Sequence, residues 1–152
     1  MNQAYQTAAK QLQAVLHEEI PLSRHIGIEV ESYDGCELRL RAPLQNNINH
    51  KLTAFGGSLY SVAVLSGWGL LYLKLKERGL AGHIVIFDSQ AHYGRPVAED
   101  IVASCGIESD EQFEKFFRIF ERKGRARIRL SAIVKQGGQT AFRLDGTYVV
   151  HV

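Results

Sequence analysis

The chain has 152 residues, of which 45% are hydrophobic and 22% charged, and its formal net charge is +2 at pH 7. This length and composition are typical of one globular domain with a buried core, so we expect a single domain over residues 1–152. The small net charge gives no argument for a nucleic-acid or membrane partner. Two cysteines, Cys36 and Cys105, and an N-terminus unlike a secretion signal lead us to expect a cytoplasmic protein.

The first third of the chain has the pattern of a helix followed by a hairpin. In chain order we expect an amphipathic helix over residues 3–19, a strand that begins near Ile26, a turn over 33–35 and a second strand over 36–42. Alternating apolar and polar residues give this hairpin one buried and one solvated face. Pro43 closes the second strand, and a loop leads to Gly56 and Gly57.

A long and mostly apolar helix follows the glycine pair. We expect it to run from about Ser58, which would cap it, to Arg78, with Gly79 as its stop signal. Its apolar stretch is shorter than the roughly 20 residues that cross a bilayer. A helix that is apolar on nearly every face is otherwise the buried central helix of a globular protein.

The rest of the chain reads as four more strands and one short helix. We expect strands over residues 83–93 and 101–109, a helix capped by Ser109 or Asp110 with a stripe of four phenylalanines, and a final hairpin over 125–152 that turns at Gly137 and Gly138. The order predicts an α+β fold in which one antiparallel sheet covers a single helix. Five or six strands leave part of that helix uncovered, so we expect at least a homodimer.

The start of the long helix is the strongest candidate for chemistry. The first backbone N–H groups of a helix lack partners within it, and the helix dipole favours negative charge there. Glycine at positions 56 and 57 lets a ligand approach the backbone closely. The pair therefore predicts either a site that polarises a carbonyl or, more simply, a tight connection between loop and helix.

Four segments together resemble the hot-dog thioesterase superfamily. They are IPLSRHIGIEV, APLQNNINHKLTAFGGSL, the apolar helix and DSQAHYGRPVAEDIVASC, and the similarity extends over about residues 20–152. The sequence looks most like thioesterase domains that also occur fused behind bacterial acetyltransferases. The resemblance implies a curved antiparallel sheet wrapped around the long helix, an additional N-terminal helix, and dimers with two active sites at the subunit interface.

The resemblance also implies roles for the residues around the helix start. Gly57, with its neighbour Gly56, would polarise the thioester carbonyl, and Asn49 matches a loop asparagine that orients water or substrate in relatives. Phe55 stands where many relatives have histidine, and Ser58 would line the substrate site.

One position departs from the pattern of the superfamily. Many relatives carry an acid about two turns into the helix, whereas this chain has Val64 there and no acid between Ser58 and Lys76. Two other residues are candidate bases. Asp88 could act across a dimer interface, and His50 has an unperturbed pKa near neutrality. Both also have ordinary structural explanations, a solvated strand residue and a loop histidine.

A basic run on the final hairpin is a second candidate contact. Arg125 and Arg127 belong to the segment RKGRARIR, where arginines alternate along one strand face. Such a run is most simply a solvated sheet face. It could also bind the phosphates of coenzyme A or an acidic acyl-carrier protein. The sequence shows no metal-ligand spacing and no exposed aromatic residues among the cations, so we expect neither a metal nor a nucleic-acid partner.

The resemblance, together with these residues, implies a hydrolase for acyl thioesters, with acyl-CoA as the expected substrate and no cofactor beyond the coenzyme A of the substrate. The first alternative is a non-catalytic module that binds acyl-CoA or acyl-carrier protein. A hot-dog dehydratase needs an acid on the helix, and a serine hydrolase needs more than the near-motif GGSLY, so both rank lower. A purely structural dimerisation domain is the simplest alternative. For the protein itself we expect a homodimer or a dimer of dimers.

Overall fold

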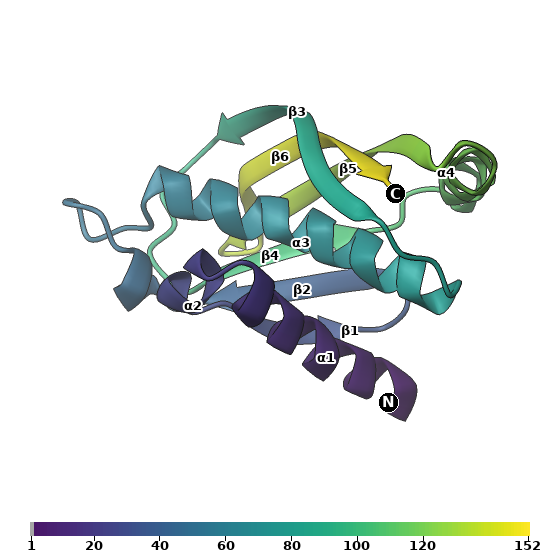
Figure 1. Cartoon of the computed structure of the whole chain (residues 1–152). Coiled ribbons are helices and arrows are strands. Elements are labelled where there is room, and N and C mark those ends of the chain that lie inside the picture. Colours follow the sequence, from purple (N-terminus) through teal and green to yellow (C-terminus); the bar gives the residue numbers. More distant parts are fainter. Residues whose placement is uncertain (1) are drawn as a thin grey trace.

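The computed structural model describes residues 2–152 as one antiparallel sheet with helices on its inner face and at its ends (Figure 1). The helices are α1 (Gln3–Glu19), α2 (Leu22–Ile26), the short 3₁₀ helix η1 (Leu44–Asn47), α3 (Gly56–Glu77) and α4 (Asp110–Lys123). The strands are β1 (Glu29–Tyr33), β2 (Glu37–Ala42), β3 (His83–Tyr93), β4 (Ile101–Gly106), β5 (Arg125–Gln136) and β6 (Gln139–His151).

The six strands lie in the order β1-β2-β4-β5-β6-β3, and every neighbouring pair is antiparallel. Helix α3 crosses the inner face of this curved sheet and contacts β2, β3, β4, β5 and β6 (Figure 1). One helix wrapped by a curved antiparallel sheet confirms the predicted α+β hot-dog architecture. The order also makes β3 an edge strand, with one side paired to β6 and the other side free within the protomer.

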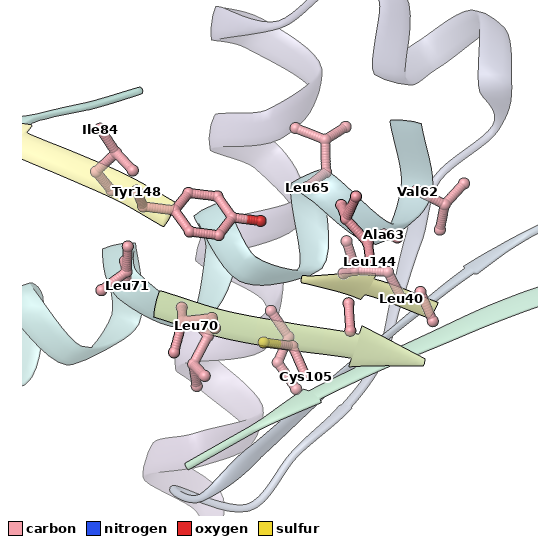
Figure 2. Packing of buried hydrophobic residues seen from close by; sticks show 14 of the residues in the cluster. Leu40, Val62, Ala63, Leu65, Leu70, Leu71, Ile84, Cys105, Leu144 and Tyr148 are labelled. Carbon is pink, nitrogen blue, oxygen red and sulfur yellow. The ribbon is translucent and has the colours of Figure 1, made fainter. Parts of the chain in front are cut away.

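Helix α3 forms the centre of the core, as its all-round apolar sequence predicts. By length and composition it could cross a membrane, but 61% of its most apolar window is buried inside the protein. Figure 2 shows Val62, Ala63, Leu65, Leu70 and Leu71 of this helix among the buried side chains of the sheet. The interpretation as a central core helix is therefore confirmed.

The N-terminal segment differs from the prediction. The alternation from Ile26 led us to expect a strand there, but Leu22–Ile26 form the short helix α2, which ends at Gly27 with a φ of 81°. The local hydrogen bonds explain the helix. Ser23 N donates to the carbonyl oxygen of Ile20, and Arg24 N donates to that of Pro21. The strand β1 begins only at Glu29.

The other elements follow the predicted pattern closely. Helix α1 and strand β3 have the predicted bounds, while the strand expected over 101–109 ends at Gly106. Ser109 caps α4 by accepting a hydrogen bond from Gln112 N, and the four phenylalanines of α4 are buried. In the last hairpin the inward residues of both strands are buried, including Ile128 of β5 and Tyr148 of β6.

Candidate active site at the start of helix α3

The first turn of α3 presents two backbone N–H groups without a partner inside the protomer. Phe55 is the N-cap residue, with φ −62° and ψ 135°, and its carbonyl oxygen accepts from Ser58 N and Leu59 N. Gly56 N and Gly57 N precede these donors and make no hydrogen bond within residues 2–152. Both amides therefore lie at the positive end of the helix dipole. The expectation that Ser58 caps the helix is wrong, because the helix begins two residues before it.

Aromatic rings lie on both sides of this helix start, and each explains one glycine. A Cβ atom on Gly57 would lie 2.5 Å from Cε2 of Phe55, so any larger residue would push that ring aside. A Cβ atom on Gly56 would lie 3.2 Å from Cε1 of Tyr93, whose hydroxyl donates to Gly56 O over 3.0 Å. The Phe55 side chain remains 57% exposed. The glycine pair thus allows close packing and leaves the two amides beside an accessible aromatic ring.

Asn49 holds the loop that leads into the helix. Its Oδ1 accepts hydrogen bonds from Lys51 N at 2.8 Å, Thr53 N at 3.1 Å and Thr53 Oγ1 at 3.2 Å. Its Nδ2 contacts Thr53 Oγ1 at 3.1 Å and Ala54 O at 3.4 Å. The polar atoms of this side chain are thus engaged within the loop itself. A contact between Asn49 and substrate stays a prediction.

A second asparagine, Asn47, anchors the same loop to the rest of the protein and was missed from the sequence. It is buried, its Nδ2 donates to Ile26 O at 2.9 Å and Pro43 O at 2.8 Å, and its carbonyl oxygen accepts from Phe55 N at 2.7 Å. The run of asparagines in this segment gives no sign of which member is buried, so the sequence contained no usable signal for Asn47.

The two candidate bases lie apart from each other. His50 is exposed in the loop before α3. Asp88 lies on the outer face of the sheet, because a bulge between Ile86 and Asp88 pairs it with Thr147, whose neighbour on β5 is the exposed Arg129. Within one protomer the strand therefore separates Asp88 from α3. Its action across a dimer interface stays a prediction.

The bulge turns a different residue of β3 toward the helix. Ser89 Oγ and Tyr60 Oη of α3 are hydrogen-bonded at 2.6 Å. Burial, and then the nearby Tyr60, raise the pKa of Tyr93 above its ordinary value, which keeps its hydroxyl protonated as the donor to Gly56 O. This hydroxyl cluster next to the free amides was also missed from the sequence.

The uncovered side of α3 forms a stripe that continues from this cluster. It consists of the partly buried residues Tyr60, Ser61, Val64, Trp68 and Tyr72. The rings of Trp68 and Tyr72 are stacked at 5.6 Å, and Trp68 Nε1 donates to Ile84 O at 3.1 Å. The free edge of β3 lies beside this stripe and exposes Val85, Ile86 and Phe87.

The remaining predicted contacts, Arg125 and Arg127, lie far from the helix start within the protomer. Both point outward from β5, since Ala126 and Ile128 between and beside them are buried. They line a groove next to α4, at the end of the sheet opposite the loop that precedes α3 (Figure 1). The structure therefore brings together Asn49, Phe55, the two glycines and Ser58, but not these arginines.

The fold is that of the hot-dog thioesterases. A thioesterase from Haemophilus influenzae has the same fold, with a TM-score of 0.68 at 16% identity over 94% of this chain and 90% of that chain. A structure described as a putative thioesterase from Shewanella oneidensis matches with a TM-score of 0.84 and 27% identity over 97% of this chain and 99% of that chain.

The particular family within this class follows from the sequence itself. Residues 9–152 match the family described as putative thioesterase (yiiD_Cterm), so the chain belongs to that family. A protein of unknown function from Chlorobaculum tepidum is 38% identical over 97% of this chain and 96% of that chain, with a TM-score of 0.92.

Proposed function

We propose that the protein hydrolyses acyl thioesters, with acyl-CoA as a substrate, at the start of α3. The observation that carries the proposal is the pair of unpartnered N–H groups of Gly56 and Gly57 at an accessible helix N-terminus. Membership of a thioesterase family and an apolar stripe that leads away from these amides support it. The acyl chain would lie along this stripe, beside Val64 and Trp68.

In the proposed reaction, the amide of Gly57 donates a hydrogen bond to the thioester carbonyl oxygen. Water adds to the carbonyl carbon and gives up a proton to a base, and the negative charge that forms on the oxygen faces the helix dipole. The carbon–sulfur bond then breaks, and the leaving thiolate takes up a proton. Tyr93 and Phe55 fix the helix start, and Asn49 holds the loop in place.

A homodimer completes this proposal. Edge strands are usually protected by charges or prolines, yet β3 carries the uncharged run from Ile84 to Phe87 next to the uncovered stripe of α3. A second copy paired along β3 would cover both surfaces. Two-fold symmetry would place the two β3 strands antiparallel, so each helix start would lie near the partner's α4 end. The candidate bases are His50 from the same protomer and Asp88 from the partner, which would have to turn from the outer face of the joined sheet to reach the site.

The experiment compares Gly57→Pro with Gly57→Ala in an acyl-CoA hydrolysis assay. Both substitutions add a Cβ atom against Phe55, but only proline removes the amide hydrogen, and proline is tolerated in the first turn of a helix. Removal of one oxyanion donor lowers kcat by about 10²–10³. We expect that loss for proline relative to alanine. Equal activity of the two variants would contradict a role for the amide.

Mixed dimers identify the base. If Asp88 serves the partner's site, a heterodimer of an Asp88→Asn chain and a Gly57→Pro chain has one intact site. Random pairing of co-expressed chains makes half of the dimers heterodimers, so about a quarter of wild-type activity returns. If the base is His50, the Asp88→Asn variant alone retains activity, whereas His50→Gln does not.

A non-catalytic module that binds acyl-CoA is the second candidate, and the absence of an acid on α3 before Glu77 favours it. It predicts no turnover by the wild type. It also predicts a rise in melting temperature with acyl-CoA, because a ligand that binds only the folded state stabilises it.

A further inference from the structure

A groove lies between α4 and the outer faces of β5 and β6, away from the proposed active site. Its volume is about 800 Å³, and it is lined on its apolar side by Phe116, Ile119 and Val149. It lies where β4 has ended, because β4 pairs with β5 only from Ala132 onward, and α4 occupies the position that a longer β4 would take. The groove is thus formed where α4 packs beside β5 and β6.

Cations gather in this groove, although Arg129 also lies near Asp145, whose pKa it helps to lower. Five cationic residues line it, and no aspartate or glutamate does: Lys115, Lys123, Arg125, Arg127 and Arg129. None of the five forms an ion pair within residues 2–152. By contrast, Arg39 and Arg41 on the outer face of β2 are each paired with a carboxylate. Like charges at close range repel one another, so the groove favours an anionic occupant.

The spread of the cations indicates the kind of anion. Arg125 and Arg129 are four residues apart on a strand, a span of about 13 Å. Lys115 and Lys123 face them from α4, so positive charge comes from both walls, with apolar side chains between. An amphipathic helix with acidic residues on both sides of an apolar face would complement these cations and the apolar side chains between them. About nine residues of such a helix cover 13 Å. A single phosphate would use only part of the groove.

We propose that this groove is the docking site for an acidic helix of the acyl-carrier protein that delivers the thioester. The proposal rests on the proposed function and narrows its substrate class. In a two-fold dimer, the groove of one protomer lies toward the helix start of the other, because paired β3 strands run in opposite directions. A carrier protein docked on one protomer would then present its acyl group to the site of the partner.

The test uses a charge-reversal pair on the α4 wall of the groove, Lys115→Glu with Lys123→Glu. The control pair, Lys10→Glu with Arg24→Glu, changes the net charge equally at residues outside the groove. The Kd for holo-acyl-carrier protein is measured by titration calorimetry at two salt concentrations. kcat/KM is measured with one acyl group carried either by the carrier protein or by coenzyme A.

We expect the groove pair to weaken carrier binding and kcat/KM for acyl-carrier protein at least tenfold, with acyl-CoA hydrolysis within twofold of wild type. The control pair should change neither by more than twofold. No carrier binding by wild type, unchanged binding by the groove pair, or an equal loss with acyl-CoA would overturn the proposal, the last by showing that the groove holds the phosphates of coenzyme A. If neither thioester is hydrolysed, the proposed function fails, while the titration still decides the docking site.

Discussion

The hydroxyl of Tyr148 in β6 donates a hydrogen bond to the carbonyl oxygen of Val64 in α3, with 2.9 Å between the two oxygens. Figure 2 shows this ring pointing from the strand toward the helix. The approach depends on Gly67, where an added Cβ atom would lie 2.2 Å from Tyr148 Oη and 2.5 Å from Cζ. The absence of a side chain at Gly67, in the middle of the central helix, therefore leaves the space that the buried ring of Tyr148 occupies.

This contact predicts that Gly67→Ala destabilises the wild type but stabilises a variant that lacks the Tyr148 ring. In the wild type the added methyl group displaces a buried ring, and overpacking of this kind costs about 1–3 kcal/mol. In a Tyr148→Leu background the ring is gone, and alanine stabilises the helix over glycine by about 1 kcal/mol. Urea unfolding of the wild type, Gly67→Ala, Tyr148→Leu and the double variant measures the four free energies of unfolding. Gly106→Ala is the control, because its nearest neighbour would be 3.5 Å away. The same cost in both backgrounds would contradict the packing argument.

The hydrogen bonds of Asn49 predict different outcomes for two substitutions. Asn49→Ala removes the acceptor of three hydrogen bonds, each with a net value of about 0.5–1.5 kcal/mol, so we expect a loss of about 1.5–4.5 kcal/mol and a tenfold fall in kcat/KM. Asn49→Asp keeps the accepting oxygen and should stay within threefold of wild-type activity. Thermal unfolding and acyl-CoA hydrolysis measure the two effects. If aspartate proves as harmful as alanine while the chain stays folded, the amide nitrogen is required as well, for its contacts with Thr53 Oγ1 and Ala54 O or for one with substrate.

The free edge of β3 predicts the oligomeric state. Ile86 is 38% exposed at the uncharged part of the edge, beside α3. A second copy would bury it, and an arginine there would place an unpaired charge in an apolar interface. We expect light scattering to give the mass of a dimer for the wild type and of a monomer for Ile86→Arg. Leu22→Arg, at an apolar residue that is 59% exposed on α2, is the control and should remain a dimer. A wild-type monomer would exclude the dimer that the mixed-chain experiment needs.

Strand β3 shows how far the sequence could predict the site. Its nearly continuous apolar start was enough to give the correct bounds, His83–Tyr93. A regular alternation from Ile84 and Ile86 would turn Asp88 inward, toward the helix. The bulge shifts the period by one residue, so Ser89 faces Tyr60 and Asp88 faces outward. A bulge depends on the pairing of two distant strands, which local sequence does not determine.

The helix start was predictable for a different reason. Free amides are a property of every helix N-terminus, so locating the first turn near Gly57 was enough to locate the donors. The true first residue depends on the cap, and here Phe55 carries no polar side chain that would mark it. The anchoring role of Asn47 arises from contacts with Ile26 and Pro43, which only the folded loop brings within reach.

The two cysteines predict how stability responds to alkaline pH. Burial, followed by the charges of Glu108 and Glu37, raises the pKa of Cys105 from 9.0 to about 12, whereas Cys36 is exposed. A pKa raised in the folded state means that the neutral thiol stabilises the fold fully below pH 9. This stabilisation is lost as the pH rises from 9 toward 12, because the unfolded chain releases a proton that the folded chain retains.

We therefore expect the unfolding free energy to fall by about 1 kcal/mol more between pH 9 and pH 10 in the wild type than in Cys105→Ala. Urea unfolding in the presence of a reductant measures this difference. Cys36→Ala is the matched control and should retain the slope of the wild type, since its thiol is exposed in the fold. Burial also raises the pKa of Tyr148, but Tyr148 is present in all three chains, so its contribution to the pH dependence is common to them and largely cancels in the comparison. Parallel slopes for all three chains would show that the Cys105 thiol is not held neutral by the core.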